Sequence, residues 1–175
     1  MGNIRQSRIL AIVIQSGRFG FAAFETPDHL LDRGMARFDS PAKARRWFIR
    51  SLRTFRPSLV VLHRRGYRDP RSGQIAKATM RMARRQAKRA SVPTTVISGR
   101  RLHEYWRREG KRNKYVVAAL IASRFPELAP AVPVGRKCYE REPWLMMRFD
   151  AVALGAAYLV QHKHDSGELF RRTSR

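Results

Sequence analysis

The first forty residues alternate between apolar runs and short polar turns. Residues 8–14 are almost wholly apolar and rich in β-branched side chains, which is typical of a strand buried on both faces. A Gln-Ser-Gly-Arg turn separates this run from a second apolar stretch over 19–25, and Thr-Pro-Asp separates the second from a third over 29–38. Such short connections predict an antiparallel meander of three strands.

Beyond residue 40 the pattern changes to alternating helices and short strands. Ser40 before Pro41 marks the start of a helix that we expect to end at Phe55. Strands are predicted over 58–63 and 92–97, helices over 74–90, 98–108, 113–124 and 145–161, and an irregular proline-containing segment over 127–142. This order predicts an α/β fold: a mixed five-stranded sheet, with three strands in the meander and two more in parallel, flanked by helices.

The length of 175 residues suits one domain with a hydrophobic core. We expect that domain over residues 1–162 and a polar, disordered tail over 163–175. The apolar runs are too short to span a bilayer and no secretory segment opens the sequence, so we expect a cytoplasmic protein without membrane contact. The single cysteine, Cys138, excludes an internal disulfide framework and a cysteine zinc cluster.

The large excess of basic residues restricts the classes of binding partner. The sequence has 37 Lys and Arg against 13 Asp and Glu, which gives a formal net charge of +24 and a pI near 11.7. So much like charge repels itself in a folded domain, and nucleic acid is the commonest polyanion that relieves the repulsion. The alternatives are a basic surface without a dedicated partner and a surface that binds an acidic protein.

The basic residues are dense in four stretches, over 43–53, 64–71, 77–89 and 100–114, and the last three supply the predicted nucleic-acid-binding residues. The first of these three follows the predicted strand over 58–63, at the carboxyl end where open α/β sheets place their ligands. The second is the helix over 74–90, in which basic residues at i, i+4 spacing share one face, and the third precedes residue 115. The predicted nucleic-acid-binding residues are Arg64, Arg65, Arg68, Arg71, Lys77, Arg81, Arg84, Arg85, Lys88, Lys111, Arg112 and Lys114.

Three aromatic residues lie among these charges. Tyr67, Tyr105 and Trp106 can stack on unpaired bases of a nucleic acid. The alternative is ordinary packing of a helix and a loop against the sheet. The sequence leaves both interpretations open.

Several short motifs occur in a fixed order along the chain. They are ILAI at 9–12 with GFA at 20–22, LDRG at 31–34, RPSLVVL at 56–62, a helix over 114–128 that ends in FPEL, and FDAVAL at 149–154. In this order and spacing they resemble motifs of RuvC-like proteins, the Holliday junction resolvase branch of the RNase H-like superfamily. The resemblance covers most of residues 8–160 and implies an RNase H-like fold.

The resemblance also implies where catalytic acids should lie. RuvC-like nucleases cut phosphodiesters with two divalent ions, Mg²⁺ or Mn²⁺, held by carboxylates. By resemblance the acids fall on Val13, His63, Met147 and Asp150, and of these Asp150 alone is an acid. Glu142 is a further acid near the same helix. We therefore predict a degenerate site in which the two ions lack ligands.

Asp150 and His63 each have a second interpretation. Asp150 can simply complement the dipole at the start of its helix, and His63 can be a half-buried polar residue at a strand end. Together the two can hold one transition metal, because imidazole prefers softer ions than Mg²⁺. The nuclease alternative rests on an unconventional metal site built on Asp150, Glu142 and His63.

From the sequence we expect a nucleic-acid-binding protein on a RuvC-like scaffold, without nuclease activity and without a cofactor. The first alternative is a structure-selective endonuclease that uses Mg²⁺ or Mn²⁺. The second is a protein-interaction subunit that binds an acidic partner. The choice between DNA and RNA stays open, as does the choice between a monomer and the homodimer that RuvC-like resolvases form.

Overall fold

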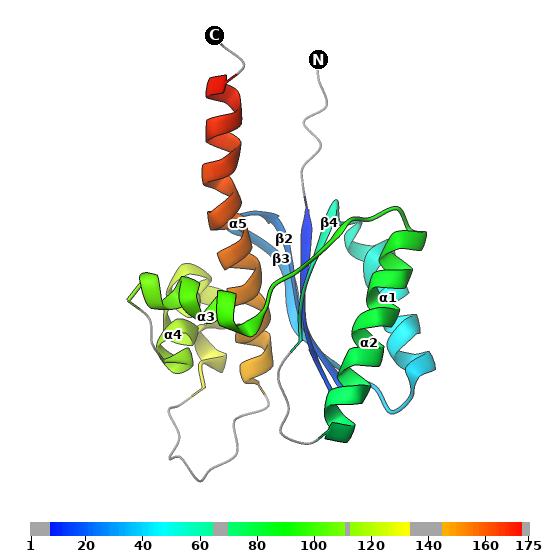
Figure 1. Cartoon of the computed structure of the whole chain (residues 1–175). Coiled ribbons are helices and arrows are strands. Elements are labelled where there is room, and N and C mark those ends of the chain that lie inside the picture. Colours follow the sequence, from blue (N-terminus) through cyan, green and yellow to red (C-terminus); the bar gives the residue numbers. More distant parts are fainter. Residues whose placement is uncertain (1–7, 65–69, 111–112, 134–144, 173–175) are drawn as a thin grey trace.

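The computed structural model describes residues 8–64, 70–110, 113–133 and 145–172, the last ten of these by their backbone alone. The described residues form one five-stranded mixed sheet in the order β3-β2-β1-β4-β5 (Figure 1). The antiparallel meander consists of β1 (Ile9–Gln15), β2 (Arg18–Thr26) and β3 (His29–Arg37), while β4 (Leu59–Arg64) and β5 (Thr94–Val96) extend the sheet in parallel to β1. This arrangement confirms the predicted fold class.

The central strand β1 is buried on both faces. Leu10, Ile12 and Ile14 pack against one helical layer, and Ile9, Ala11 and Val13 pack against the other. The continuous apolar run is explained by this position between two layers. A two-residue turn joins β1 to β2, and its Gly17 has a φ of 71°, in the left-handed region that glycine adopts without cost.

Helices cover both faces of the sheet (Figure 1). One face carries α1 (Pro41–Phe55) and α2 (Pro70–Arg89), and the other carries α3 (Gly99–Arg108), α4 (Lys114–Arg124), the 3-10 turn η1 (Pro126–Ala131) and α5 (Met146–Arg172). Each face has its own hydrophobic cluster. Within the described ranges, none of the helices combines the length and the hydrophobicity that a bilayer crossing requires.

Most strand boundaries differ from the sequence prediction by one or two residues, and three helical boundaries differ more. The helix α2 begins at Pro70 rather than Gln74, because proline suits the first turn of a helix. The turn η1 occupies the beginning of the segment that was predicted to be irregular, and α5 reaches Arg172 rather than ending at Gln161. The division into a domain over 1–162 and a disordered tail over 163–175 stays a prediction.

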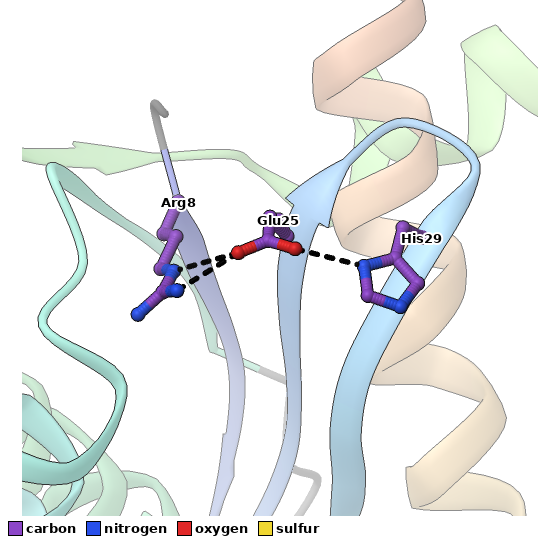
Figure 2. Close-up of polar contacts among 3 residues, drawn as sticks. All are labelled: Arg8, Glu25 and His29. Carbon is purple, nitrogen blue, oxygen red and sulfur yellow. Dashed lines mark hydrogen bonds and ion pairs between the residues drawn. The ribbon is translucent and has the colours of Figure 1, made fainter. Parts of the chain in front are cut away.

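Glu25, at the end of β2, joins the three strands of the meander (Figure 2). Its carboxylate accepts a hydrogen bond of 2.8 Å from Nη2 of Arg8, just before β1, and lies 3.1 Å from Nδ1 of His29 on β3. The hydrogen bonds from Arg8 hold the pKa of Glu25 below its ordinary value, and His29 acts in the same direction. The contact therefore favours the ionised carboxylate in the folded state.

We expect Glu25→Gln to lower the melting temperature at pH 7 by about 1–3 °C, as is typical when one partially exposed ion pair is lost. Because the pKa of Glu25 is lowered on folding, its contribution is fully present above the unfolded value of 4.5 and is lost as the pH falls through the folded value. Thermal unfolding of both proteins from pH 7 to pH 3 checks this. Glu104→Gln, which breaks an exposed pair within α3, is the control, and a difference that persists at pH 3 would contradict the role of ionised Glu25.

Candidate functional site

The four positions expected to carry acids come together near the carboxyl ends of β1 and β4. Val13 pairs with Gly20 on β2 and with His63 on β4. The first turn of α5 lies directly on Gly20, since a Cβ built there would be 2.3 Å from the carbonyl oxygen of Met147. Asp150 follows one turn later and lines a pocket that it shares with His63.

Two of these four side chains belong to the hydrophobic core. Val13 is 0% exposed and Met147 is 2% exposed, and both pack in the cluster beneath α5. No group of three or more His, Cys, Asp or Glu that is able to hold a metal ion occurs in the described part of the chain, and Glu142 lies outside that part. Because Mg²⁺ and Mn²⁺ need several oxygen ligands, the residues described here do not fit a pair of such ions.

The shared pocket has a volume of about 170 Å³ and lies between the end of β4, α3, α4 and α5. The ring of His63 is buried, and its Nδ1 lies 2.8 Å from the carbonyl oxygen of Ile97. A carbonyl oxygen accepts and never donates, so Nδ1 carries the proton. In the neutral ring, Nε2 is then unprotonated, and in this tautomer it can accept a hydrogen bond or bind a metal.

Lys114 also lines this pocket, together with His103. Lys114 opens α4, whose N-terminus is capped by Asn113: the side-chain oxygen of Asn113 accepts a 2.8 Å hydrogen bond from the backbone N–H of Tyr115. The sequence assigned Lys114 to the basic segments and did not associate it with His63 and Asp150. The available signal was its place at the start of the helix over 114–128, whose FPEL end resembles a motif of RuvC-like proteins. A cation, an imidazole and a carboxylate thus line one small pocket.

The aromatic residues of α3 pack against each other and the core instead of being exposed to solvent. Trp106 lines the pocket but is 9% exposed and belongs to the core cluster. The ring of Tyr105 meets it edge-on, with centroids 4.9 Å apart, and burial raises the pKa of the Tyr105 hydroxyl. These positions favour the packing interpretation over base stacking, while Tyr67 lies outside the described residues.

The predicted nucleic-acid-binding residues do not form one surface. Lys114 lies at the pocket, and Arg64 and Arg71 lie at the end of β4 and the start of α2. The exposed residues of α2 lie on the other side of the sheet from α5; they are Lys77, Arg81, Arg84, Arg85 and Lys88. Arg65, Arg68, Lys111 and Arg112 lie outside the described residues. The sheet therefore divides these basic residues into two groups.

Comparison with known proteins shows a likeness in fold. No protein-family model and no curated protein sequence matches the chain. Thermus thermophilus RuvC in complex with a Holliday junction superposes with a TM-score of 0.67 at 14% identity, over 90% of this chain and 96% of that one. The yeast mitochondrial Holliday junction resolvase gives 0.64 at 15% identity, over 91% and 81% of the two chains. The fowlpox virus resolvase in complex with junction DNA gives 0.52 at 13% identity, over 87% and 99%. The chain thus has the RNase H-like fold of these resolvases, as its sequence motifs predict.

Proposed function

We propose that this protein binds nucleic acid on a RuvC-like scaffold and does not hydrolyse phosphodiesters by the two-metal route. The observation that carries the proposal is the set of side chains where β1, β4 and α5 meet. Two-metal hydrolysis needs carboxylates at that point, because the ions neutralise charge on the attacking and leaving oxygens. Val13 and Met147 are buried apolar side chains without an oxygen ligand, and His63 is an imidazole.

The net charge of +24 supports nucleic acid as the ligand. Arginine outnumbers lysine on the basic segments, and its planar guanidinium suits bidentate contacts to phosphate. Such contacts position a nucleic acid without reading its bases. Two of the similar structures contain Holliday junctions, so a four-way DNA junction is the first ligand to test.

The test measures binding and cleavage on the same substrates. A labelled four-way DNA junction, a linear duplex of the same arms and a structured RNA are incubated with the protein in Mg²⁺, in Mn²⁺ or in EDTA. We expect bound complexes in gel-shift assays and no product beyond the EDTA control, while an active junction resolvase cleaves the junction under the same conditions. Metal-dependent product that disappears in Asp150→Asn would contradict the proposal.

One observation favours a second candidate function, a structure-selective endonuclease with an unconventional metal site. His63 and Asp150 line the same pocket, and an imidazole with a carboxylate suits one transition metal better than a pair of Mg²⁺ ions. For this candidate we expect cleavage that depends on Mn²⁺ or Zn²⁺ and is lost in both Asp150→Asn and His63→Ala. If the protein neither binds nor cuts nucleic acid, an acidic protein partner becomes the explanation of its charge.

A further inference from the structure

The helical layer of α1 and α2 carries a large excess of positive charge, of which Lys43 is balanced by Asp39 just before α1. The sequence of α1 contains five Lys or Arg and that of α2 contains seven, and neither helix contains Asp or Glu. Within the described part of the chain, no ion pair involves Arg50, Arg53 or the basic residues of α2 from Lys77 onward. Their charges are therefore available to an external polyanion.

Two grooves flank the C-terminal half of α2. A groove of about 480 Å³ separates it from α1, and its basic residues are Arg53, Arg56 and Arg89. A second groove of about 620 Å³ lies on its other side, next to β5, and its basic residues are Arg81, Arg84, Arg85 and Lys88. This half of α2 is thus a ridge between two cationic grooves, each suited to a phosphate backbone.

Backbone conformation gives a second, independent observation at the same place. Among the described residues, Arg56 and Ser91 are the non-glycine residues with positive φ, at 46° and 56°. Each follows the end of a helix and lines one of the grooves. Arg56 is the cap of α1 and donates its backbone N–H to the carbonyl of Leu52 at 3.0 Å. Glycine is the usual residue at a left-handed cap, because a Cβ there is unfavourable. An arginine at this position keeps a cation at the groove despite the backbone strain.

Stabilisation of the helices does not explain the whole face. Cations in the last turn interact favourably with a helix dipole, which accounts for Arg53, Lys88 and Arg89. The effect of the dipole falls off within that turn, so it does not stabilise Arg81. Arg81 and Arg85 are four residues apart on one face of α2, and like charges at this spacing repel each other and destabilise a helix. A bound polyanion would remove that repulsion.

The α1–α2 face points away from the pocket of His63, Lys114 and Asp150, because the sheet lies between the two (Figure 1). His63 lies on the sheet itself, so the sheet and one helical layer of about 10 Å each put roughly 20 Å between this pocket and the outer surface of α2. That separation is more than twice the Debye length of about 8 Å at physiological salt. A nucleic acid on one surface therefore leaves the charge of the other surface unneutralised.

We propose that the α1–α2 face binds a second nucleic-acid duplex through its phosphates, so that one chain bridges two segments. One segment lies at the pocket of His63, Lys114 and Asp150, and the other lies on the grooves beside α2. This inference rests on the proposed nucleic-acid binding. Because the contacts are to phosphates, bridging has little sequence preference.

A co-capture experiment tests the bridge. A biotinylated duplex is held on beads, and the full chain is added with a fluorescent duplex of another sequence. Wild type is expected to retain the fluorescent duplex on the beads. Combined Arg53→Gln, Arg56→Gln and Arg89→Gln should lower that retention about tenfold or more, because several phosphate contacts are lost. Lys114→Gln on the opposite side is the matched variant and should weaken capture about fivefold through the other surface.

The outcomes separate this inference from the proposed function. Retention that survives the triple substitution would mean that bridging comes from association of copies, and the inference would be overturned. Capture of the protein by the tethered duplex without the fluorescent duplex overturns the inference and leaves nucleic-acid binding intact. Failure of the protein to reach the tethered duplex at all overturns both.

Arg56→Gly separates a binding role from a capping role. Glycine relieves the strain of the left-handed cap, so the melting temperature should stay the same or rise. Retention of the second duplex should nevertheless fall about fivefold, the effect of one lost phosphate contact. Unchanged retention in the folded variant would remove Arg56 from the surface and contradict the argument from backbone strain.

Discussion

Val13→Asp is expected to destabilise the fold by about 3–5 kcal/mol rather than create a metal ligand. Val13 is 0% exposed, pairs with strands on both sides and packs in the cluster beneath α5. An introduced carboxylate would be buried among hydrocarbon side chains without a positive partner. Burial of an unpaired charge is among the costliest single changes in a protein.

The pH dependence identifies the cause of this loss. Burial raises the pKa of the introduced carboxyl, so the penalty is full above the folded value and shrinks as the pH falls toward the unfolded value near 4. Urea unfolding at pH 8 and pH 5 measures the difference. Val13→Thr, similar in shape and uncharged, should cost about 1–3 kcal/mol at both pH values. An aspartate variant that Mg²⁺ restores to wild-type stability would contradict our description of this position.

Nucleic-acid affinity should fall about 10³–10⁵-fold between 50 and 200 mM salt if six to ten phosphates are contacted. Each neutralised phosphate releases condensed counterions, and added salt opposes that release. Fluorescence anisotropy on a four-way junction over a KCl series gives the slope of log K against log salt.

The slope can be assigned to residues by substitution. Lys114→Gln should reduce the magnitude of the slope by about 1, the value for one lost phosphate contact, and should leave sequence preference unchanged. A flat response to salt would show that phosphates do not dominate binding, and would exclude the α1–α2 face and the pocket as electrostatic surfaces.

Local sequence patterns predicted most of the fold because each element has its own physical signature. The apolar run of β1 and the Ser16-Gly17 turn specify a hairpin, and Ser40 with Pro41 specifies the start of α1. The sheet order then follows from short connections and parallel crossovers. Boundaries were less predictable: the beginning of α2 depends on Pro70, which reads from sequence as a loop residue just as well.

The candidate site was harder to predict because it depends on which elements pack together. The motif spacing correctly placed Val13, His63 and Asp150 near one another. It did not reveal that Lys114 lines the same pocket, which results from packing of α4 against α5. The helical periodicity of α2 also does not indicate which face of the sheet the helix covers. Only the topology shows that the basic residues of α2 lie on the face opposite the pocket.

The contact between Gly20 and α5 has a consequence for the position of the pocket. At this point the strand meets the backbone of Met147 with no side chain between them. The close approach of α5 to β2 therefore depends on the absence of a side chain at position 20. A side chain there would push the start of α5, and with it Met147 and Asp150, away from the strand ends that carry Val13 and His63.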